Sequence, residues 1–576
     1  MNPSLNSALS LRLPVWRARV LLMLVLTWFV VLAARALYLQ GLQHDFLQQK
    51  GESRYARIME VPAHRGMITD RSGEPLAVST PVESVWASPA DAQLDSTQRA
   101  RLAKLLDLDG GELAKKLGET EREFIFIKRH LAPEVAVKVV ALNLPGVSLQ
   151  REYRRYYPAA DVMAQVVGFT SVDDVGQEGM ELAQQEWLAG IPGSRKVIKD
   201  RIGHVVEDVQ GLRAPQPGRD LVLSIDSRIQ YLAYRELKSA VAANGAKAGG
   251  LVVLDVKTGE ILALANWPTH NPNNRGTLNP QRARNRVVTD LFEPGSTLKP
   301  FTAAAALESR VAGPQTIVDV SAGKLTIGSA TIHDAHRESA LTVSQIIQKS
   351  SNVGAAKLAL ATPREVLWKA FNDAGFGMLS GSGFPGEASG RLRDHRKWRP
   401  IEQATLSYGH GISVSLLQLA RAYSMFASDG QIIPITMLRS DEVAQGTQVI
   451  SVQTAIAVRH MLESVTEPGG TGVRAQVMGY RVAGKTGTAH KLENGSYAAD
   501  RYVSSFVGFA PVSEPRLLIA VMLDEPSSGE YYGGVVAAPV FSQVMSGALR
   551  ALGVAPDAPM ENLAPLDGAP LVKEEV

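Results

Sequence analysis

The chain has 576 residues, which is enough for a membrane anchor and two or more domains that each bury a core. It contains no cysteine, and this excludes disulfides, thiol catalysis and thiolate metal sites. Its 60 Lys and Arg residues against 57 Asp and Glu residues give a net charge of +3, and no basic stripe with interleaved aromatic residues indicates nucleic-acid binding.

The first element in the chain is an apolar segment, residues 18–39, which is long enough to cross a bilayer as a helix. Three arginines stand at or before its start, and no acidic residue occurs before Asp45. The positive-inside rule therefore predicts that residues 1–17 are a cytoplasmic tail and that the rest of the chain lies outside. Ala34-Arg35-Ala36 also fits a signal-peptide cleavage site, but the apolar run continues past it, which favours an uncleaved anchor.

Residues 40–218 are predicted to form a linker followed by an N-terminal domain. The linker runs from Gln40 to Val61, and strands then alternate with charged helical pieces such as Ser96 to Leu108, in which three leucines share one face. The stretch Arg213 to Arg219 contains two prolines and a glycine and predicts the domain boundary. No chemistry is visible before this boundary, so we expect this domain to bind partners or to serve as a pedestal.

A second, α+β domain is predicted over residues 219–554, where helices accompany an antiparallel sheet. Leu221 to Ile225 reads as a strand, and Asp226 follows it in the position of a helix cap. Leu251 to Asn266 reads as a β-hairpin. The last segment, residues 555–576, is rich in proline, alanine and acidic residues and is predicted to be disordered.

Ser296 and Lys299 form a Ser-x-x-Lys motif at the start of an alanine-rich helical run. The spacing i, i+3 puts both side chains on one face of a helix, where an uncharged lysine can take the proton of a serine nucleophile. Burial, the positive helix N-terminus and a second nearby cation all favour an uncharged lysine. Pro300 cannot donate to the carbonyl of Ser296, so we expect an irregular first turn.

Similar strings elsewhere in the chain show that one such motif alone is weak evidence for an active site. Ser321 to Lys324 is a second Ser-x-x-Lys, but Gly323 to Ile332 alternates like a β-ribbon, so that serine and lysine would not share a helical face. Lys257 to Gly259 is a second Lys-Thr-Gly, and it reads as the turn of the predicted hairpin. Order and setting therefore carry the interpretation.

The tripeptide Ser350-Ser351-Asn352 follows the apolar stretch Val343 to Ile347. A hydroxyl two residues before an amide suits a loop that relays a proton to a leaving group while the amide holds the substrate backbone. Taken alone, the same residues are more typical of a polar turn at the end of a helix.

The string Lys485-Thr486-Gly487-Thr488 permits two incompatible interpretations. Counted from Gly479 it fits a phosphate-binding P-loop, and counted from Lys485 it is the third element of a serine acyl-transfer site. A P-loop requires a helix that begins at Lys485, whereas a hairpin signal follows at Asn494-Gly495. Leu517 to Asp524 resembles the acidic-ended strand of an NTPase but also an ordinary buried strand. The acyl-transfer interpretation is favoured.

With the three motifs in this order, the chain resembles the class B penicillin-binding proteins, which are peptidoglycan D,D-transpeptidases of the bacterial envelope. Within that family it is most similar to the monofunctional, division-specific (septal) members of Gram-negative bacteria. Further segments carry the resemblance: Arg65–Ala77, Arg151–Pro158, Gly176–Glu181, Arg286–Ser296, Tyr408–Gly411 and Tyr531–Gly534. The resemblance implies a transmembrane helix, a pedestal domain and a penicilloyl serine transferase fold.

The implied mechanism is a two-step acyl transfer. Lys299 takes the proton of Ser296, which attacks the penultimate D-Ala carbonyl of a donor stem peptide, while backbone N–H groups of Ser296 and Thr488 hold the oxyanion. An amine of a second stem peptide then attacks the acyl-enzyme. The predicted catalytic residues are Ser296, Lys299, Ser350, Asn352 and Lys485. The predicted substrate-binding residues are Thr486, Gly487, Thr488, Tyr502, Phe506, Tyr531 and Tyr532, although aromatic residues in strands more often lie in the core.

The resemblance also implies the partners and the location. Stem peptides, β-lactam antibiotics, the inner membrane, the septal glycosyltransferase and other divisome membrane proteins are expected partners, with the catalytic domain in the periplasm. No cofactor, metal or nucleic acid is expected, and the pair His333 and His336 reads as a solvated turn. A non-catalytic divisome scaffold, a serine β-lactamase and a P-loop NTPase remain alternatives.

Overall fold

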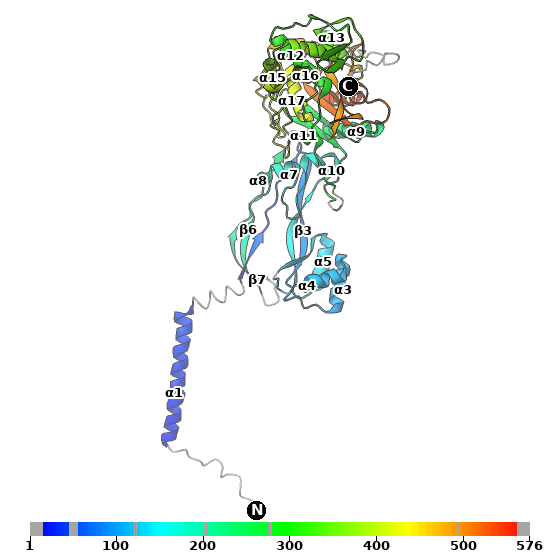
Figure 1. The fold of residues 1–576 in the computed structure, drawn as a ribbon. Coiled ribbons are helices and arrows are strands. Elements are labelled where there is room, and N and C mark those ends of the chain that lie inside the picture. The colour runs from blue at the N-terminus through cyan, green and yellow to red at the C-terminus, as the bar shows by residue number, and fades with distance from the viewer. Residues whose placement is uncertain are drawn as a thin grey trace, which may run out of the picture. The chain divides into compact units, whose positions relative to one another are not determined.

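The computed structural model describes residues 15–44, 56–119, 121–122, 124–199, 205–274, 276, 279–493 and 496–561 (Figure 1). Four predictions fall wholly or partly outside these residues. They concern most of the cytoplasmic tail, the middle of the linker, the Asn494-Gly495 turn and the tail beyond residue 561.

The apolar segment near the N-terminus forms the helix α1 (Val15–Leu37), which continues into a short π-helical turn, Tyr38–Leu42. Its side chains are exposed, as expected of a helix that needs a surrounding apolar phase. The one polar hydroxyl in its middle, that of Thr27, donates to the carbonyl of Met23 at 2.8 Å. Among the described residues this is the one helix long and apolar enough to span a membrane.

The described residues form two compact units. The first contains the described residues up to Ala63 together with Pro81–Tyr153 and Ile191–Gln216. The second contains His64–Thr80, Arg154–Gly190 and the chain from Pro217 onward. The predicted domain boundary at residues 218 and 219 stays a prediction.

The first unit has a helical part with its own core. The helix α3 (Ser96–Leu106) begins where Asp95 accepts from the backbone N–H of Gln98 at 2.7 Å, and it buries Leu102 and Leu106. It ends two residues earlier than Leu108, because Asp107 adopts a left-handed φ of 50°. The other elements of this unit are β1 (Ala56–Val61), β4 (Ile125–Leu131), β6 (Gly193–Lys199), β7 (Val205–Arg213), α4 (Gly110–Leu117) and α5 (Pro133–Ala141). Two strands have residues in both units: β3 (Pro75–Ala87) and β5 (Val147–Tyr156).

The second unit begins with a buried ionic cluster. Glu181 accepts from Arg65 Nε at 2.7 Å and from Arg155 Nε at 2.6 Å, and all three side chains are almost fully buried. A buried carboxylate needs such partners, because its desolvation is costly unless charge and hydrogen bonds compensate it. The short elements around it are β2 (Ile68–Thr69), β8 (Leu221–Val222), the 3-10 turn Ala160–Val162, α6 (Ala164–Val167), α7 (Gly179–Ala183) and α8 (Gln185–Leu188).

A five-stranded antiparallel sheet forms the centre of the second unit, in the order β10-β9-β19-β18-β17. Its strands are β9 (Ala248–Asp255), β10 (Ile261–Trp267), β17 (Ala483–Glu493), β18 (Ser496–Ala510) and β19 (Leu517–Asp524). The predicted hairpin is confirmed as β9 and β10, and Leu517–Asp524 is confirmed as a strand. The strand β17, which carries Lys485, lies at an edge of the sheet.

Helices cover both faces of this sheet. On one face lie α9 (Ser227–Ala243) and α20 (Ala538–Ala551), and α9 begins, as predicted, where Asp226 accepts from the N–H of Arg228 at 3.0 Å. Leu251 and Val253 pack on this face, whereas Val252 and Leu254 pack on the other. A strand buried on both faces explains why Leu251 to Asp255 reads as a continuous apolar run rather than an alternating one.

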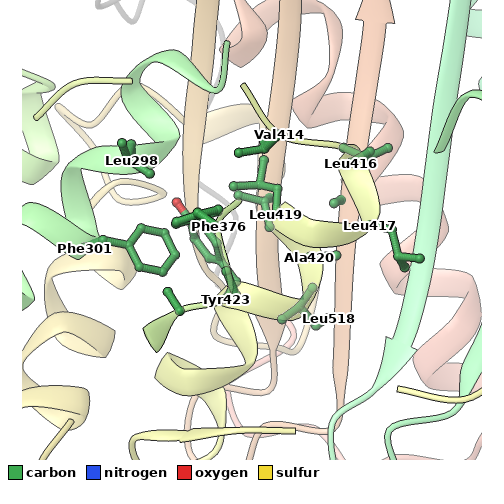
Figure 2. Close-up of a cluster of buried hydrophobic side chains, with 14 of the residues drawn as sticks. Leu298, Phe301, Phe376, Val414, Leu416, Leu417, Leu419, Ala420, Tyr423 and Leu518 are labelled. Atoms are coloured by element: carbon green, nitrogen blue, oxygen red, sulfur yellow. The ribbon is translucent and has the colours of Figure 1, made fainter. Parts of the chain in front are cut away.

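The opposite face of the sheet carries the larger helical group, drawn green to yellow in Figure 1. Figure 2 shows the core beneath it, where side chains of α17 (Leu416–Ala427) lie near Leu518 of β19. The other helices of this group are α11 (Arg286–Thr289), α12 (Lys299–Glu308), α13 (Val343–Lys349), α14 (Asn352–Ala361), α15 (Arg364–Asp373), α16 (Pro400–Leu406) and α18 (Val452–Ser464). The remaining elements are α10 (Pro280–Ala283), α19 (Gly533–Val536), the strand pairs β11 (Ile317–Asp319) with β14 (Ala340–Thr342), β12 (Lys324–Ile327) with β13 (Ala330–His333) and β15 (Gln431–Ile432) with β16 (Thr447–Gln448), and three 3-10 turns, Gly295–Leu298, His395–Lys397 and Val473–Ala475. The ribbon predicted around Gly323–Ile332 is confirmed by β12 and β13.

Candidate active site

Ser296 lies in a 3-10 turn, Gly295–Leu298, directly before the helix α12. The N–H of Lys299 donates to the carbonyl of Ser296, three residues back, because Pro300 has no N–H to make the four-residue bond of an α-helix. The irregular first turn predicted from Pro300 is thereby confirmed. The turn displays Ser296 at a helix start, with its side chain only 4% exposed.

The amine of Lys299 makes the central contacts of the site. Its Nζ lies 2.9 Å from the hydroxyl oxygen of Ser296, 3.0 Å from that of Ser350 and 2.5 Å from the carbonyl oxygen of Ser350. The side chain is 1% exposed, so water does not compete for these contacts. At 2.9 Å, a proton can pass directly between the Ser296 hydroxyl and an uncharged amine.

Ser350 lies in the tight connection between α13 and α14. It caps the end of α13 in a left-handed conformation with φ 63°, and Ser351 begins α14 by accepting from the N–H of Gly354 at 2.8 Å. The hydroxyl of Ser351 in turn donates to Asp334 at 2.7 Å. The segment is therefore a polar turn at a helix end as well as part of the site, and it holds Ser350 in place. Asn352 begins α14 and is buried.

Lys485 approaches the same hydroxyl from the sheet. Its Nζ donates to Ser350 Oγ at 3.0 Å, so Ser350 lies between this amine and that of Lys299. Two positively charged amines on one hydroxyl would repel each other. Lys485 lies inside the strand β17, and no helix begins there. The nucleotide-binding interpretation of this string is therefore wrong, because a P-loop lysine must open a helix.

The three residues after Lys485 are buried, and here the strand β17 packs closely against the turn that carries Ser296. A Cβ on Gly487 would lie 2.8 Å from Thr297 Cγ2 and 2.9 Å from the carbonyl oxygen of Pro294, so only glycine fits there. Thr486 Oγ1 accepts from Lys485 Nζ at 3.1 Å, and Thr488 Oγ1 accepts from the N–H of Gly533 at 3.0 Å.

Aromatic rings form a stack beside the end of β17. The rings of Tyr502 and Tyr531 are parallel with centroids 3.9 Å apart, and the Tyr532 centroid lies 4.5 Å from that of Tyr531. Ser504, which faces Thr488 across the strand pair, donates its hydroxyl to the carbonyl of Tyr531 and holds the segment on the sheet. Phe506 is different: it lies four residues further along β18, on the same face of the strand, and it is fully buried against Phe541 of α20. Its predicted place at the cleft is corrected, because its ring fills the core.

The structure adds residues that sequence reasoning missed. The carboxylate of Glu293 accepts from the N–H of Gly411 at 2.8 Å and from the hydroxyl of Tyr497 at 3.0 Å, and burial raises its pKa. Burial, together with the nearby Lys299 and His490, lowers the pKa of His410 to about 4, so this ring is neutral near pH 7. The available signals were the position of Glu293, three residues before Ser296, and the segment Tyr408–Gly411.

A cavity of about 320 Å³ opens beside these residues, and Glu293, Ala489, His490 and Lys491 are among those that line it. Within the described part of the chain, no group of three or more His, Cys, Asp or Glu side chains is placed to hold a metal ion. The predicted catalytic residues supply hydroxyl, amine and amide groups, which suits acyl transfer through a serine.

Comparison with known proteins gives the same picture. Residues 249–546 match the penicillin binding protein transpeptidase domain, and residues 60–223 match the penicillin-binding protein dimerisation domain. The chain is 44% identical over 548 residues, 94% of both chains, to the probable peptidoglycan D,D-transpeptidase PenA of Neisseria gonorrhoeae. It is 41% identical to the peptidoglycan D,D-transpeptidase FtsI of Escherichia coli K12, covering 94% of this chain and 93% of that one.

A solved structure agrees with these matches. The transpeptidase domain of penicillin-binding protein 3 from Burkholderia pseudomallei, in its apo form, superposes with a TM-score of 0.54 at 47% identity, covering 58% of this chain and 98% of that domain. At 47% identity the two proteins share their sequence as well as their fold. With a matched dimerisation domain, a matched transpeptidase domain and relatives of nearly full length, the chain belongs to the family of penicillin-binding protein transpeptidases.

Proposed function

We propose that this protein is a peptidoglycan D,D-transpeptidase that cross-links stem peptides at the division septum through an acyl-enzyme on Ser296. The observation that carries the proposal is the chain of contacts from Ser296 to Lys299, Ser350 and Lys485, with distances of 2.9, 3.0 and 3.0 Å. Three distant motifs thus meet around one hydroxyl, as a serine acyl-transfer site requires.

In the first step, Lys299 removes the proton of Ser296 as Ser296 Oγ attacks the penultimate D-Ala carbonyl of the donor. The backbone N–H groups of Ser296 and Thr488 stabilise the oxyanion, and each such donor is worth about 3 kcal/mol in the transition state. Ser350 relays a proton to the departing D-Ala, and its position between two amines supports this role. Lys485, Thr486 and Thr488 bind the terminal carboxylate, with Gly487 allowing its close approach.

In the second step, the amine of an acceptor stem peptide attacks the acyl-enzyme and forms the cross-link. Asn352 orients the acyl chain, and the stacked rings of Tyr502, Tyr531 and Tyr532 line the cleft. β-Lactams mimic the donor terminus and acylate Ser296 in place of it. The Ser296 hydroxyl, with Lys299 and Ser350 beside it, carries both acyl-transfer steps in this proposal.

The proposal includes a location and partners. The positive charge at the N-terminal end of α1 supports an N-terminus in the cytoplasm, a single pass through the inner membrane and a catalytic part in the periplasm. Similarity to the septal branch supports contact with the septal glycosyltransferase and other divisome membrane proteins. The test is a fusion of the C-terminus to a phosphatase that works only outside the cytoplasm. We expect the fused phosphatase to be active, and an inactive fusion would indicate the opposite orientation.

The direct test is acylation of the full-length protein, purified in detergent, by a fluorescent penicillin. We expect one adduct that mass spectrometry maps to Ser296 and that Ser296→Ala abolishes. Ser321→Ala is the matched control, because Ser321 begins the second Ser-x-x-Lys string yet lies exposed outside the site. An adduct on another residue, or one that survives Ser296→Ala, would contradict the proposal.

Two further measurements separate the remaining alternatives. A transpeptidase keeps its penicillin label for long periods, whereas a serine β-lactamase hydrolyses it rapidly, so the rate of label loss distinguishes the two. A non-catalytic scaffold would support septation without its nucleophile. We expect cells that depend on Ser296→Ala to form filaments, and normal septation in such cells would favour the scaffold.

A further inference from the structure

Thr471 lies in the loop between α18 and β17, outside all three motifs of the site. Its Oγ1 is 2.7 Å from Thr486 Oγ1, and both side chains are buried. A contact of this length between two buried hydroxyls is a full hydrogen bond in which one oxygen donates and the other accepts. It connects this loop with the strand β17.

The hydrogen bond extends the chain of contacts that reaches Ser296. Thr486 Oγ1 accepts from Lys485 Nζ at 3.1 Å, and Lys485 donates to Ser350 Oγ at 3.0 Å. The order from the loop to the relay is thus Thr471, Thr486, Lys485 and Ser350. A hydroxyl rotor without such a neighbour can turn away, because its orientation is otherwise set by weak torsional preferences.

The loop is held firmly enough to act as a fixed point. The N–H of Gly472 donates to the carbonyl of Val465 at 2.9 Å, and Gln476 Nε2 donates to the carbonyl of Thr466 at 2.9 Å. A Cβ on Gly534 would lie only 2.2 Å from the carbonyl oxygen of Thr471, so the backbone of α19 packs directly against this residue.

We propose that Thr471 is a positioning residue for acyl transfer. Its hydroxyl fixes the rotor of Thr486 so that a lone pair faces Lys485, and this contact keeps the Lys485 amine at the hydroxyl of Ser350. The inference rests on the proposed function, since it assigns Thr471 to the proton relay of that reaction. Thr471 touches neither Ser296 nor Lys299 and acts through its neighbours.

The test compares two substitutions that separate the hydroxyl from the methyl group. Thr471→Val keeps the shape and removes the hydroxyl, whereas Thr471→Ser keeps the hydroxyl and removes a methyl group. Thr466→Val is the matched control: Thr466 is buried in the same loop and donates its hydroxyl to the carbonyl of Val482 at 2.8 Å, away from Lys485. The limiting rate of acylation by a fluorescent penicillin and the midpoint of thermal unfolding are measured for each full-length protein.

We expect Thr471→Val to lower the limiting acylation rate about tenfold, which corresponds to the loss of one well-placed hydrogen bond. Thr471→Ser should return to within about threefold of the wild-type rate, although it leaves a small void. Thr466→Val should lower the midpoint of thermal unfolding about as much as Thr471→Val does, and it should leave the acylation rate unchanged.

Two results would overturn the inference while leaving the proposed function standing. One is a wild-type rate in Thr471→Val, and the other is an equal loss of rate in Thr466→Val and Thr471→Val, which would indicate a general effect of stability. Wild-type protein that takes no label at all would instead overturn the proposed function, and the inference with it.

Discussion

The hydroxyl of Tyr423, on α17, donates a 2.6 Å hydrogen bond to the backbone carbonyl of Thr297, the residue that follows Ser296. Figure 2 shows this ring among the apolar side chains of the core, with Phe301 and Leu298 on the side of the 3-10 turn. The ring meets Phe301 edge-on, with centroids 5.4 Å apart. The core of the second unit thus supports the turn of the nucleophile through one polar atom.

Removal of the Tyr423 hydroxyl should lower the acylation rate as well as the stability of the fold. We expect Tyr423→Phe to lower the unfolding free energy by about 1–2 kcal/mol and the acylation rate about fivefold to tenfold, because the turn loses a fixed carbonyl. Tyr480→Phe is the matched control, since Tyr480 donates an equal 2.6 Å bond to the carbonyl of Val554, away from the site. Equal loss of rate in both variants would refute the special role of Tyr423.

Gly487 should tolerate no side chain. A Cβ there would lie 2.6 Å from Ser505 Oγ and 2.8 Å from Thr297 Cγ2, so Gly487→Ala must push β17 away from the turn that carries Ser296. A displacement of about 1 Å lowers the rate of an enzyme about 100-fold, and we expect at least that loss of acylation. Gly211→Ala, in β7 with no atom near the new Cβ, should acylate normally. Near-normal acylation by Gly487→Ala would contradict the packing described.

The buried cluster of Glu181 with Arg65 and Arg155 should be sensitive to loss of its carboxylate charge. Glu181→Gln leaves two buried guanidinium groups without an anion between them, and we expect the unfolding free energy to fall by about 3–5 kcal/mol. Asp373→Asn removes the partner of the exposed Lys369 and should change it by less than about 1 kcal/mol. Denaturant unfolding of both variants measures the difference. Equal losses of unfolding free energy would show that the buried cluster contributes no more to stability than the exposed ion pair.

His410 should make the stability depend on pH. Its pKa is about 4 in the folded protein against an ordinary 6.5, so the unfolded chain binds more protons between these values. Stability therefore rises as the pH increases through this window, and acidification across all of it costs at most about 3 kcal/mol, because one pKa unit corresponds to about 1.4 kcal/mol. Glu293, whose pKa is raised, acts in the opposite direction.

The comparison of His410→Gln with wild type isolates this contribution. The slope of the unfolding free energy between about pH 4 and about pH 6.5 should be shallower in the variant. His333→Gln, at an exposed position, should keep the wild-type slope. An unchanged slope in His410→Gln would show that the ring titrates normally.

Local sequence signals were sufficient for much of the fold. The cap at Asp226, the hairpin of β9 and β10 and the strand β19 all follow from short-range chemistry, because caps, turns and apolar runs are decided by neighbouring residues. The placement of Ser296, Ser350 and Lys485 around one another could be inferred only from their order along the chain. Distances between them depend on tertiary packing, which local patterns do not contain.

The parts that sequence reasoning missed depend on how deeply each position of a strand is buried and on long-range contacts. Phe506 and Tyr502 lie on the same strand and both read as aromatic strand residues, yet one packs on α20 and the other stacks on Tyr531. Thr471 belongs to no motif, and the motif segment that contains Glu293 does not reveal the contacts of its carboxylate. Their importance follows from hydrogen bonds to residues far away in the chain, and such contacts leave no periodic signal.

The bond between Lys485 and Ser350 spans 135 positions of the chain, whereas the bond between Lys299 and Ser350 spans 51. During synthesis, therefore, the serine and its neighbouring base can meet long before the strand β17 has been made. Contacts of such long range form late, because the intervening chain must first be ordered. A nascent or truncated polypeptide that ends before β17 carries the reactive hydroxyl but lacks the sheet edge beside it, so acyl-transfer competence should arise only once nearly the entire polypeptide has folded.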